Sequence, residues 1–171
     1  MEYLDVVDEN GMPTGKVEER TKVHREGIRH RTAHVWIGRK EPGTGRIQVV
    51  MQKRSQGKDS YPGCYDISSA GHVPAGVDYL PSALRELKEE LGIEAEAEDL
   101  HFLFYHGEYY EDVFYGQPFR NEEYSAIYLY IKPVDLKSLT LQEEEVEEVR
   151  WFDYEETLPS VLEGDKKYCL N

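Results

Sequence analysis

Three glutamates crowd one side of a predicted helix in the segment from Gly71 to Ile93, which reads GHVPAGVDYLPSALRELKEELGI. At about 100° per residue, Glu86, Glu89 and Glu90 fall within roughly 100° of arc, while the leucines gather on another face. Like charges three or four residues apart destabilise an isolated helix, and a hard divalent cation among their oxygens makes the cluster favourable. The pattern therefore predicts leucines facing a core and glutamates binding Mg²⁺ or Mn²⁺. The alternative is a solvated face, the usual meaning of a helix rich in glutamate and lysine.

The sequence also predicts where this helix begins and ends. Asp78 stands where an N-cap would open it, with Pro81 in the first turn, where proline is tolerated. Gly92 is expected to end it as the C′ residue. A last short helix is expected from Tyr154 to about Leu162, capped by Asp153, and the rest of the pattern is mostly β. The expected strands are Tyr3 to Val7, Thr14 to Val17, Thr32 to Gly38, Ile47 to Lys53, Phe102 to Tyr105, Glu123 to Ile131 and Val146 to Phe152.

The helical segment resembles the Nudix signature G-x5-E-x7-R-E-U-x-E-E-x-G-U, in which U is a bulky aliphatic residue. The matching residues are Gly71, Arg85, Glu86, Leu87, Glu89, Glu90, Gly92 and Ile93. One position departs, because the first Glu of the signature falls on Val77, with Asp78 one place later. In the families it resembles, that Glu mainly supports the loop, and the group from Glu86 to Glu90 carries the metal. The resemblance therefore implies that metal binding survives, while Val77 leaves the strength of catalysis open.

The resemblance implies an α/β (α+β) fold, a Nudix-type α/β/α sandwich with a mixed β-sheet. An N-terminal β-hairpin at about residues 1–20 is expected in addition. The length of 171 residues suits a single domain over 1–171, and no linker or repeat divides the chain. Specificity in this superfamily lies in loops outside the signature, here chiefly Tyr105 to Arg120. The tyrosines of that region are expected to pack on strands, or to line a pocket.

A second resemblance extends from about Leu4 to Trp151, to type I isopentenyl-diphosphate isomerases and their hydrolase-like relatives. Its elements are VVDENGMPTG, the histidines around REGIR, QKRSQGKDSYPGCYDISSAGH and EEVEEVRWF. In the isomerases, histidines and downstream glutamates hold a divalent metal. The matching positions are His24, His30, His72 and, less clearly, Glu122, whereas the other downstream glutamate falls on Arg120.

Isomerase chemistry is disfavoured by one residue. The isomerases use a cysteine directly before the first Gly of the signature, and that place is Ala70 here. A methyl group cannot transfer a proton, and the nearby serines are far weaker acids than a thiol. Hydrolysis of a diphosphate needs only charge neutralisation and an oriented water.

The expected activity is thus Mg²⁺-dependent hydrolysis of the diphosphate linkage in a small nucleoside-diphosphate-type or related metabolite. Arg85 is expected to hold a glutamate by a bidentate pair. Arg54 and Lys58 match diphosphate-contacting residues of the isomerase branch, Arg31 does so less clearly, and Gly71 borders the substrate. The general base stays open among Glu122, Glu123 and Glu145. The alternatives are an isopentenyl-diphosphate isomerase and a non-catalytic nucleotide-binding module.

The formal net charge of −14 argues against nucleic acid or anionic lipid as partners, because both need a basic face. No apolar run approaches about 18 residues, and the N-terminus does not resemble a signal peptide. These features predict a soluble, cytoplasmic monomer or homodimer. Cys64 and Cys169 lack metal-type spacing and are expected to be reduced thiols.

Overall fold

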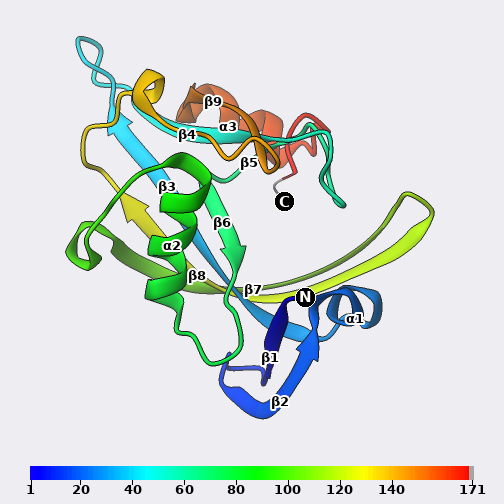
Figure 1. Cartoon of the computed structure of the whole chain (residues 1–171). Coiled ribbons are helices and arrows are strands. Elements are labelled where there is room, and N and C mark those ends of the chain that lie inside the picture. The colour runs from blue at the N-terminus through cyan, green and yellow to red at the C-terminus, as the bar shows by residue number, and fades with distance from the viewer. Residues whose placement is uncertain (170–171) are drawn as a thin grey trace.

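The computed structural model describes residues 1–169 and places them in nine strands and three α-helices (Figure 1). The strands are β1 Tyr3–Val7, β2 Pro13–Glu19, β3 Arg29–Lys40, β4 Ile47–Arg54, β5 Tyr65–Asp66, β6 Ser69–His72, β7 His101–Phe114, β8 Gln117–Tyr130 and β9 Val146–Asp153. The α-helices are α1 Arg20–Glu26, α2 Tyr79–Leu91 and α3 Tyr154–Leu162, with short 3₁₀ turns η1 Ala97–Asp99 and η2 Leu136–Ser138. No helix within residues 1–169 is long and apolar enough to cross a membrane.

The main sheet is mixed, as predicted. Its strand order is β5-β4-β3-β8-β7, with β6 also paired to β3 and β9 to β4. Strands β3 and β8 run parallel, and the other pairs are antiparallel. Strands β1 and β2 form the predicted N-terminal hairpin as a separate sheet. Strand β3 pairs with β6 through residues 32–35 and with β4 through residues 38–40. Strands β4 and β6 both contribute residues to the site described below, and β3 holds them in position.

Helix α2 packs its leucines on one face of this sheet, as the sequence pattern predicts. Leu87 and Leu91 are completely buried and share one core cluster with Val35 and Ile37 of β3. The Asp78 side chain accepts a hydrogen bond from the Tyr79 amide, which confirms the predicted N-cap. Gly92 ends the helix at a φ of 72°, the left-handed conformation that favours glycine. The glutamate face of α2 is therefore directed away from the core.

Two expectations are wrong. Two helices are expected from the sequence, but the described residues contain a third, α1, which has only seven residues and is capped by Glu19 rather than by a common N-cap residue. Residues 105–120 do not form a loop, because they belong to the long β7–β8 hairpin (Figure 1). Its turn places Tyr115 and Gly116 at φ of 51° and 74°, as a two-residue type I′ turn requires.

A buried ion pair fastens the N-terminal hairpin to β3, and a hydrogen bond from a backbone amide fastens it to the segment before α2. Asp5 Oδ2 accepts hydrogen bonds from Arg31 Nη2 at 2.8 Å and from the Gly76 amide at 2.9 Å. Both side chains are buried, and Arg31 does not line the cavity described below. The weak match of Arg31 to a phosphate-contacting residue is therefore not supported by its position.

Replacing Asp5 with asparagine is expected to lower the free energy of unfolding by about 1.5 kcal/mol, because the amide cannot compensate the buried Arg31 charge. Urea denaturation measures this loss. Glu9→Gln, at the exposed turn of the same hairpin, is the control. A loss no larger than that of the control would show that the pair contributes nothing to the attachment.

Candidate functional site

The first two glutamates of α2 lie at the mouth of a cavity beside strand β6. A Cβ placed on Gly71 would lie 2.3 Å from Glu86 Cδ, so only glycine permits this side chain to lie against β6. Arg85 Nη2 contacts Glu86 Oε1 at 3.1 Å, and Arg85 Nε lies 3.9 Å from Glu89 Oε1. Arg85 thus bridges two glutamates instead of forming the bidentate pair expected from the sequence. Glu89 is half exposed at its side chain.

Glu90 is the most buried carboxyl group of the helix, with 5% of the residue exposed. Its Oε1 accepts hydrogen bonds from Ser69 Oγ at 2.9 Å and from the Ala70 amide at 3.0 Å. Burial, together with the neighbouring Glu86, raises the pKa of Glu90 to about 8. Burial raises the pKa of Glu86 as well. Two acidic groups whose ionised forms are this costly indicate a site built for a cation.

The donor set fits Mg²⁺ or Mn²⁺. Hard divalent cations of this size prefer carboxylate oxygens, and Glu86, Glu89 and Glu90 supply them from one helical turn and a half. Within residues 1–169, Glu90 has no ion pair with a lysine or arginine that would take the place of a metal.

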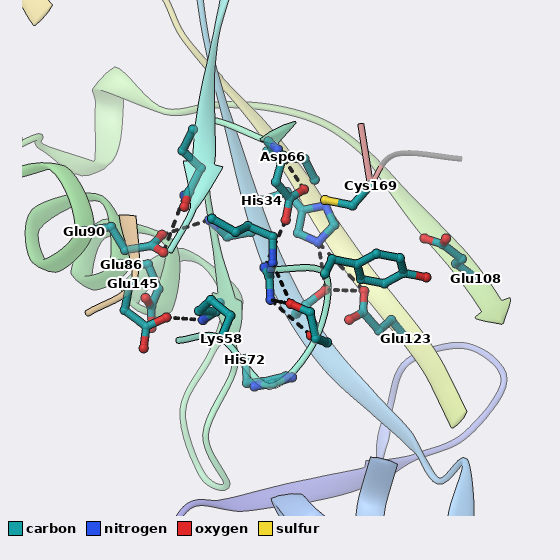
Figure 2. A pocket seen from close by; sticks show the side chains of 18 of the residues that line it. His34, Lys58, Asp66, His72, Glu86, Glu90, Glu108, Glu123, Glu145 and Cys169 are labelled. Carbon is teal, nitrogen blue, oxygen red and sulfur yellow. Dashed lines mark hydrogen bonds and ion pairs between the residues drawn. The ribbon is translucent and has the colours of Figure 1, made fainter. Parts of the chain in front are cut away.

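A cavity of about 520 Å³ begins at these glutamates. Figure 2 shows Glu86, Glu90 and the Lys58–Glu145 pair on one side, and Asp66, His34 and Glu123 on the other. The volume suits a nucleotide-sized ligand. The residues that line it come from the N-terminal segment, from α1 and α2, from β3, β4, β5 and β6, from both strands of the long hairpin and from the C-terminal segment.

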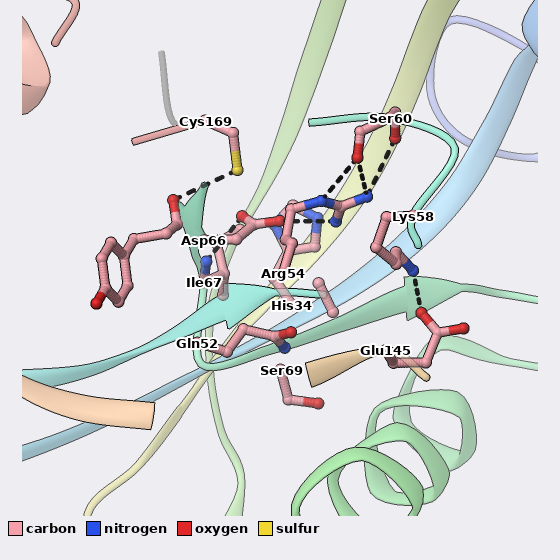
Figure 3. Close-up of polar contacts among 12 residues, drawn as sticks. His34, Gln52, Arg54, Lys58, Ser60, Asp66, Ile67, Ser69, Glu145 and Cys169 are labelled. Carbon is pink, nitrogen blue, oxygen red and sulfur yellow. Dashed lines mark hydrogen bonds and ion pairs between the residues drawn. The ribbon is translucent and has the colours of Figure 1, made fainter. Parts of the chain in front are cut away.

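Both predicted phosphate contacts line this cavity, and each already has partners (Figure 3). Arg54 donates from Nε and Nη2 to the Ser60 carbonyl and pairs with Asp66 Oδ2 at 3.2 Å. Lys58 Nζ is paired with Glu145. These contacts hold both cations at the cavity wall in fixed positions, with donor capacity left for an anion.

The three candidate general bases are separated by the fold. Glu122 pairs with Arg29 at 2.7 Å and is not part of the cavity lining. Glu123 lines the cavity on the side away from α2 (Figure 2). Glu145 also lines the cavity, on the segment that the Gln142 amide anchors to the Glu90 carbonyl. Of the three candidates, Glu145 is therefore the one whose chain segment is anchored to α2, which carries the predicted metal ligands.

The three predicted histidines come together. One ring nitrogen from each of His24, His30 and His72 lies within 4.8 Å of the others. Burial is the main cause that lowers their pKa values, to about 3 for His24, so the rings are neutral and can act as ligands. His30 Nε2 is buried without a hydrogen-bond partner. Glu122 does not belong to this cluster.

Sequence reasoning missed two charged residues beside the histidines. Glu2 Oε1 lies 3.9 Å from His72 Nδ1, and Arg20 pairs with Asp59 at 3.3 Å; Glu2 and Arg20 both line the cavity. They come from the N-terminal hairpin and the start of α1. The sequence predicts the hairpin as an element, but nothing in the local sequence indicates that the hairpin packs against the cavity.

The family follows from comparison with known proteins. A family model described as the NUDIX domain matches residues 28–170. The chain belongs to the Nudix family. Nudix hydrolase 3 of Arabidopsis thaliana is 40% identical over 169 residues, covering 98% of this chain and 21% of the relative. An uncharacterized Nudix hydrolase of Clostridium acetobutylicum is 36% identical over 145 residues, covering 85% of this chain and 66% of the relative. This chain therefore spans about a fifth of the length of the Arabidopsis relative and about two thirds of the length of the Clostridium relative.

Solved structures show the same Nudix fold. The crystal structure of DR0079 from Deinococcus radiodurans has a TM-score of 0.68 and 19% identity, covering 95% of this chain and 90% of that one. An Ap4A hydrolase of C. elegans in a binary complex has a TM-score of 0.52 and 25% identity, covering 75% and 83% of the two chains. The predicted superfamily and fold class are confirmed. The resemblance to the isomerase branch stays a prediction.

Proposed function

We propose that this Nudix chain is a hydrolase that depends on Mg²⁺, or on Mn²⁺, and cleaves the diphosphate linkage of a small nucleoside-diphosphate-type or related metabolite. The observation that carries the proposal is the pair of buried carboxyl groups, Glu86 and Glu90, at one end of a cavity that also contains Arg54 and Lys58. A divalent ion bound there would neutralise phosphate charge and acidify a bound water. Arg54 and Lys58, which line the same cavity, would hold the diphosphate oxygens.

Glu145 is the general base that this arrangement supports best. It lines the cavity, and its contact with Lys58 fixes the side chain in place. A carboxylate fixed in this way can accept a proton from a water molecule in the cavity. Gly71 contributes by letting Glu86 reach the same space.

The histidine cluster is proposed as a second metal site. Three neutral imidazoles within 4.8 Å, one of them with an unpartnered ring nitrogen, match the ligand preference of a transition metal. The isomerase resemblance supports the same assignment. Glu2 is the nearest carboxylate, and Glu122 is turned to Arg29 instead.

Isomerisation is the weaker candidate. Ala70 lines the cavity at the position of the isomerase cysteine and offers only its backbone amide, which donates to Glu90. The Cys169 thiol also lines the cavity, but burial raises its pKa and makes it a poor proton carrier. The expectations of a cytoplasmic location and of a monomer or homodimer remain predictions from the sequence.

Removal of the metal tests the proposed function. The purified chain is expected to hydrolyse at least one diphosphate from a panel of nucleotide sugars, dinucleoside polyphosphates, coenzyme A, flavin dinucleotide and prenyl diphosphates. Activity should require Mg²⁺ or Mn²⁺ and should stop with EDTA, as measured by release of phosphate-containing products. Calorimetric titration with Mn²⁺ should give more than one ion per chain, and one fewer in His30→Ala. Metal binding without turnover of any compound would favour a non-catalytic binding module.

A further inference from the structure

The end of the cavity opposite the α2 glutamates is formed by one face of the parallel strands β3 and β8. Thr32 lies beside Ser125 and His30 beside Glu123 in the register of this pair. Side chains alternate along a strand, so Thr32 and His34 share a face with Glu123 and Ser125. Figure 2 shows His34 and Glu123 together on this side of the cavity.

This face is polar although much of it is buried. Thr32 is 3% exposed and Ser125 is 1% exposed. The opposite face of the same strands carries Ala33, Val35 and Ala126, which belong to the apolar core under α2. Thr32 Oγ1 and Ser125 Oγ are hydrogen-bonded to each other, and Thr32 and Glu123 line the cavity, so this face gives the cavity a polar wall that suits a polar ligand.

Glu123 is the charged group at the centre of this face. Its Oε2 accepts a long hydrogen bond of 3.4 Å from Thr32 Oγ1 and lies 3.9 Å from His34 Nε2. Burial is the main cause that lowers the pKa of His34, so this ring is neutral and does not compensate a carboxylate. Within residues 1–169, no lysine or arginine forms an ion pair with Glu123. Asp66, an acidic residue on the same side of the cavity, is paired with Arg54 (Figure 3).

Asn121 is a second buried polar residue beside Glu123, although it does not line the cavity. It lies two residues before Glu123 on the same face of β8 and is 1% exposed. Within residues 1–169, neither its amide nitrogen nor its amide oxygen has a hydrogen-bond partner of ordinary geometry. Burial is the main cause that raises the pKa of Glu123, and the nearby Asn121 side chain opposes this shift only in part. A buried amide without partners is rare in a folded protein, so the polar groups around Glu123 are not all satisfied within the fold.

Aromatic rings border the same region. Tyr61, Tyr110 and Phe119 line the cavity, with ring centroids 5.9 Å apart for Tyr61 and Tyr110 and 6.1 Å apart for Tyr110 and Phe119. Aromatic faces bind flat rings by stacking and bind cationic nitrogen by cation–π attraction. A carboxylate acceptor beside such rings suits a ligand group that carries N–H donors.

Resting on the proposed function, we infer that Thr32 and Glu123, with the aromatic rings beside them, form a recognition subsite for an N–H-bearing end group of the diphosphate substrate. Glu123 is the accepting group and therefore a specificity-determining residue. The N–H donors come either from the exocyclic amino group of a nucleobase or from a primary ammonium group at the other end of the diphosphate. Both sources present N–H groups to the same acceptor.

Two matched substrate pairs test this subsite and separate the sources. ADP-ribose and its purine-riboside analogue differ only by the 6-amino group, and CDP-ethanolamine and CDP-ethylene glycol differ by an ammonium group in place of a hydroxyl group. The parent chain is expected to prefer the N–H-bearing member of one pair by roughly tenfold or more in kcat/KM. In Glu123→Gln the preference should fall to about threefold or less, because an amide presents donors of its own to the ligand. Glu111→Gln, at an exposed position of β7 outside the cavity, is the control and should keep the parent preference.

Equal kcat/KM within both pairs for the parent chain would overturn the inference. So would a Glu123→Gln variant that loses both members of a pair equally, since this would indicate a catalytic or structural role. If the parent chain turns over none of the four compounds, calorimetric titration of the same pairs with Mg²⁺ decides the matter. If the parent chain prefers the N–H-bearing member in binding and Glu123→Gln removes this preference, the subsite is supported although the proposed hydrolysis fails. Equal binding of both members, or no binding, would overturn the subsite as well.

Discussion

Replacing Glu90 with glutamine is expected to lower kcat/KM by about a thousandfold and to leave the fold intact. The carboxylate charge is what a divalent ion binds, and the amide has none. The glutamine amide oxygen can still accept the two hydrogen bonds that Ser69 Oγ and the Ala70 amide donate to Glu90. Steady-state kinetics on the substrate identified by the panel measure the loss, and far-ultraviolet circular dichroism verifies the fold.

Stability provides the second measurement on the same variant. Burial disfavours the ionised form of Glu90, so the metal-free Glu90→Gln chain should be at least as stable as the parent at pH 8. Glu94→Gln is the matched control, because Glu94 lies just after α2 and its side chain is 80% exposed. A Glu90→Gln variant with parental kcat/KM would refute the assignment of Glu90 to the metal site.

The features around the candidate site that the structure confirms are those of one continuous segment, helix α2 and its ends. The spacing of Glu86 and Glu90, the leucine face and the cap at Asp78 all lie within α2 or directly beside it. Helical periodicity and capping are local rules, so they hold without knowledge of the tertiary fold. The close approach of Gly71 to Glu86 explains why glycine opens the segment, and this reason is visible only in the structure.

The parts that the sequence does not predict depend on contacts between distant segments. Thr32 and Glu123 meet because β3 and β8 pair in parallel, and no local pattern specifies that register. The same holds for Glu145, whose contact with Lys58 depends on the segment after η2 folding back over β4. The long β7–β8 hairpin is missed because its strands are interrupted by Gly107 and by many charged residues, so alternation of polar and apolar residues is weak there.

The part that the N-terminal residues Glu2 and Arg20 play in the cavity was not predicted for a similar reason. Glu2 and Arg20 reach the cavity because the β1–β2 hairpin is attached through Asp5 to Arg31 of β3 and to the segment before α2. An attachment of this kind joins residues far apart in the sequence, and charge or hydropathy at each residue alone does not reveal it. The hairpin was correctly expected as an element, while its part in the site was not.

The metal-free chain is expected to be most stable near pH 6.5 and to lose stability on both sides. Above this pH the cause is Glu90, whose pKa is raised from 4.5 to about 8. Unfolded chains have released this proton by pH 6.5 and the folded chain still holds it, so the free energy of unfolding falls as the pH rises to about 8. At about 1.4 kcal/mol per pH unit, the loss between pH 6.5 and pH 8 is about 2 kcal/mol.

Below pH 6.5 the histidines act in the opposite direction. The pKa of His24 is lowered from 6.5 to about 3. Between these two pH values, His24 is protonated in the unfolded chain and neutral in the folded chain. Stability is therefore lost as the pH falls, by about 3 kcal/mol between pH 6.5 and pH 4.5 for His24 alone, partly offset by Glu90. His30 and His72, whose pKa values are also lowered, add to the loss.

Urea denaturation in EDTA at pH 4.5, 6.5 and 8 measures both limbs, and variants separate them. Glu90→Gln should flatten the curve between pH 6.5 and pH 8, whereas Glu94→Gln should leave it unchanged. Saturating Mg²⁺ should stabilise the parent chain more at pH 8 than at pH 6.5, because the ion binds only ionised carboxylates and displaces the Glu90 proton. A parent curve that is flat above pH 6.5, or equally steep in Glu90→Gln, would mean that Glu90 is ionised in the folded chain without a metal. In that case the buried carboxyl groups would need another cation in the protein to compensate them, and the argument for a metal-binding turn of α2 would lose its physical basis.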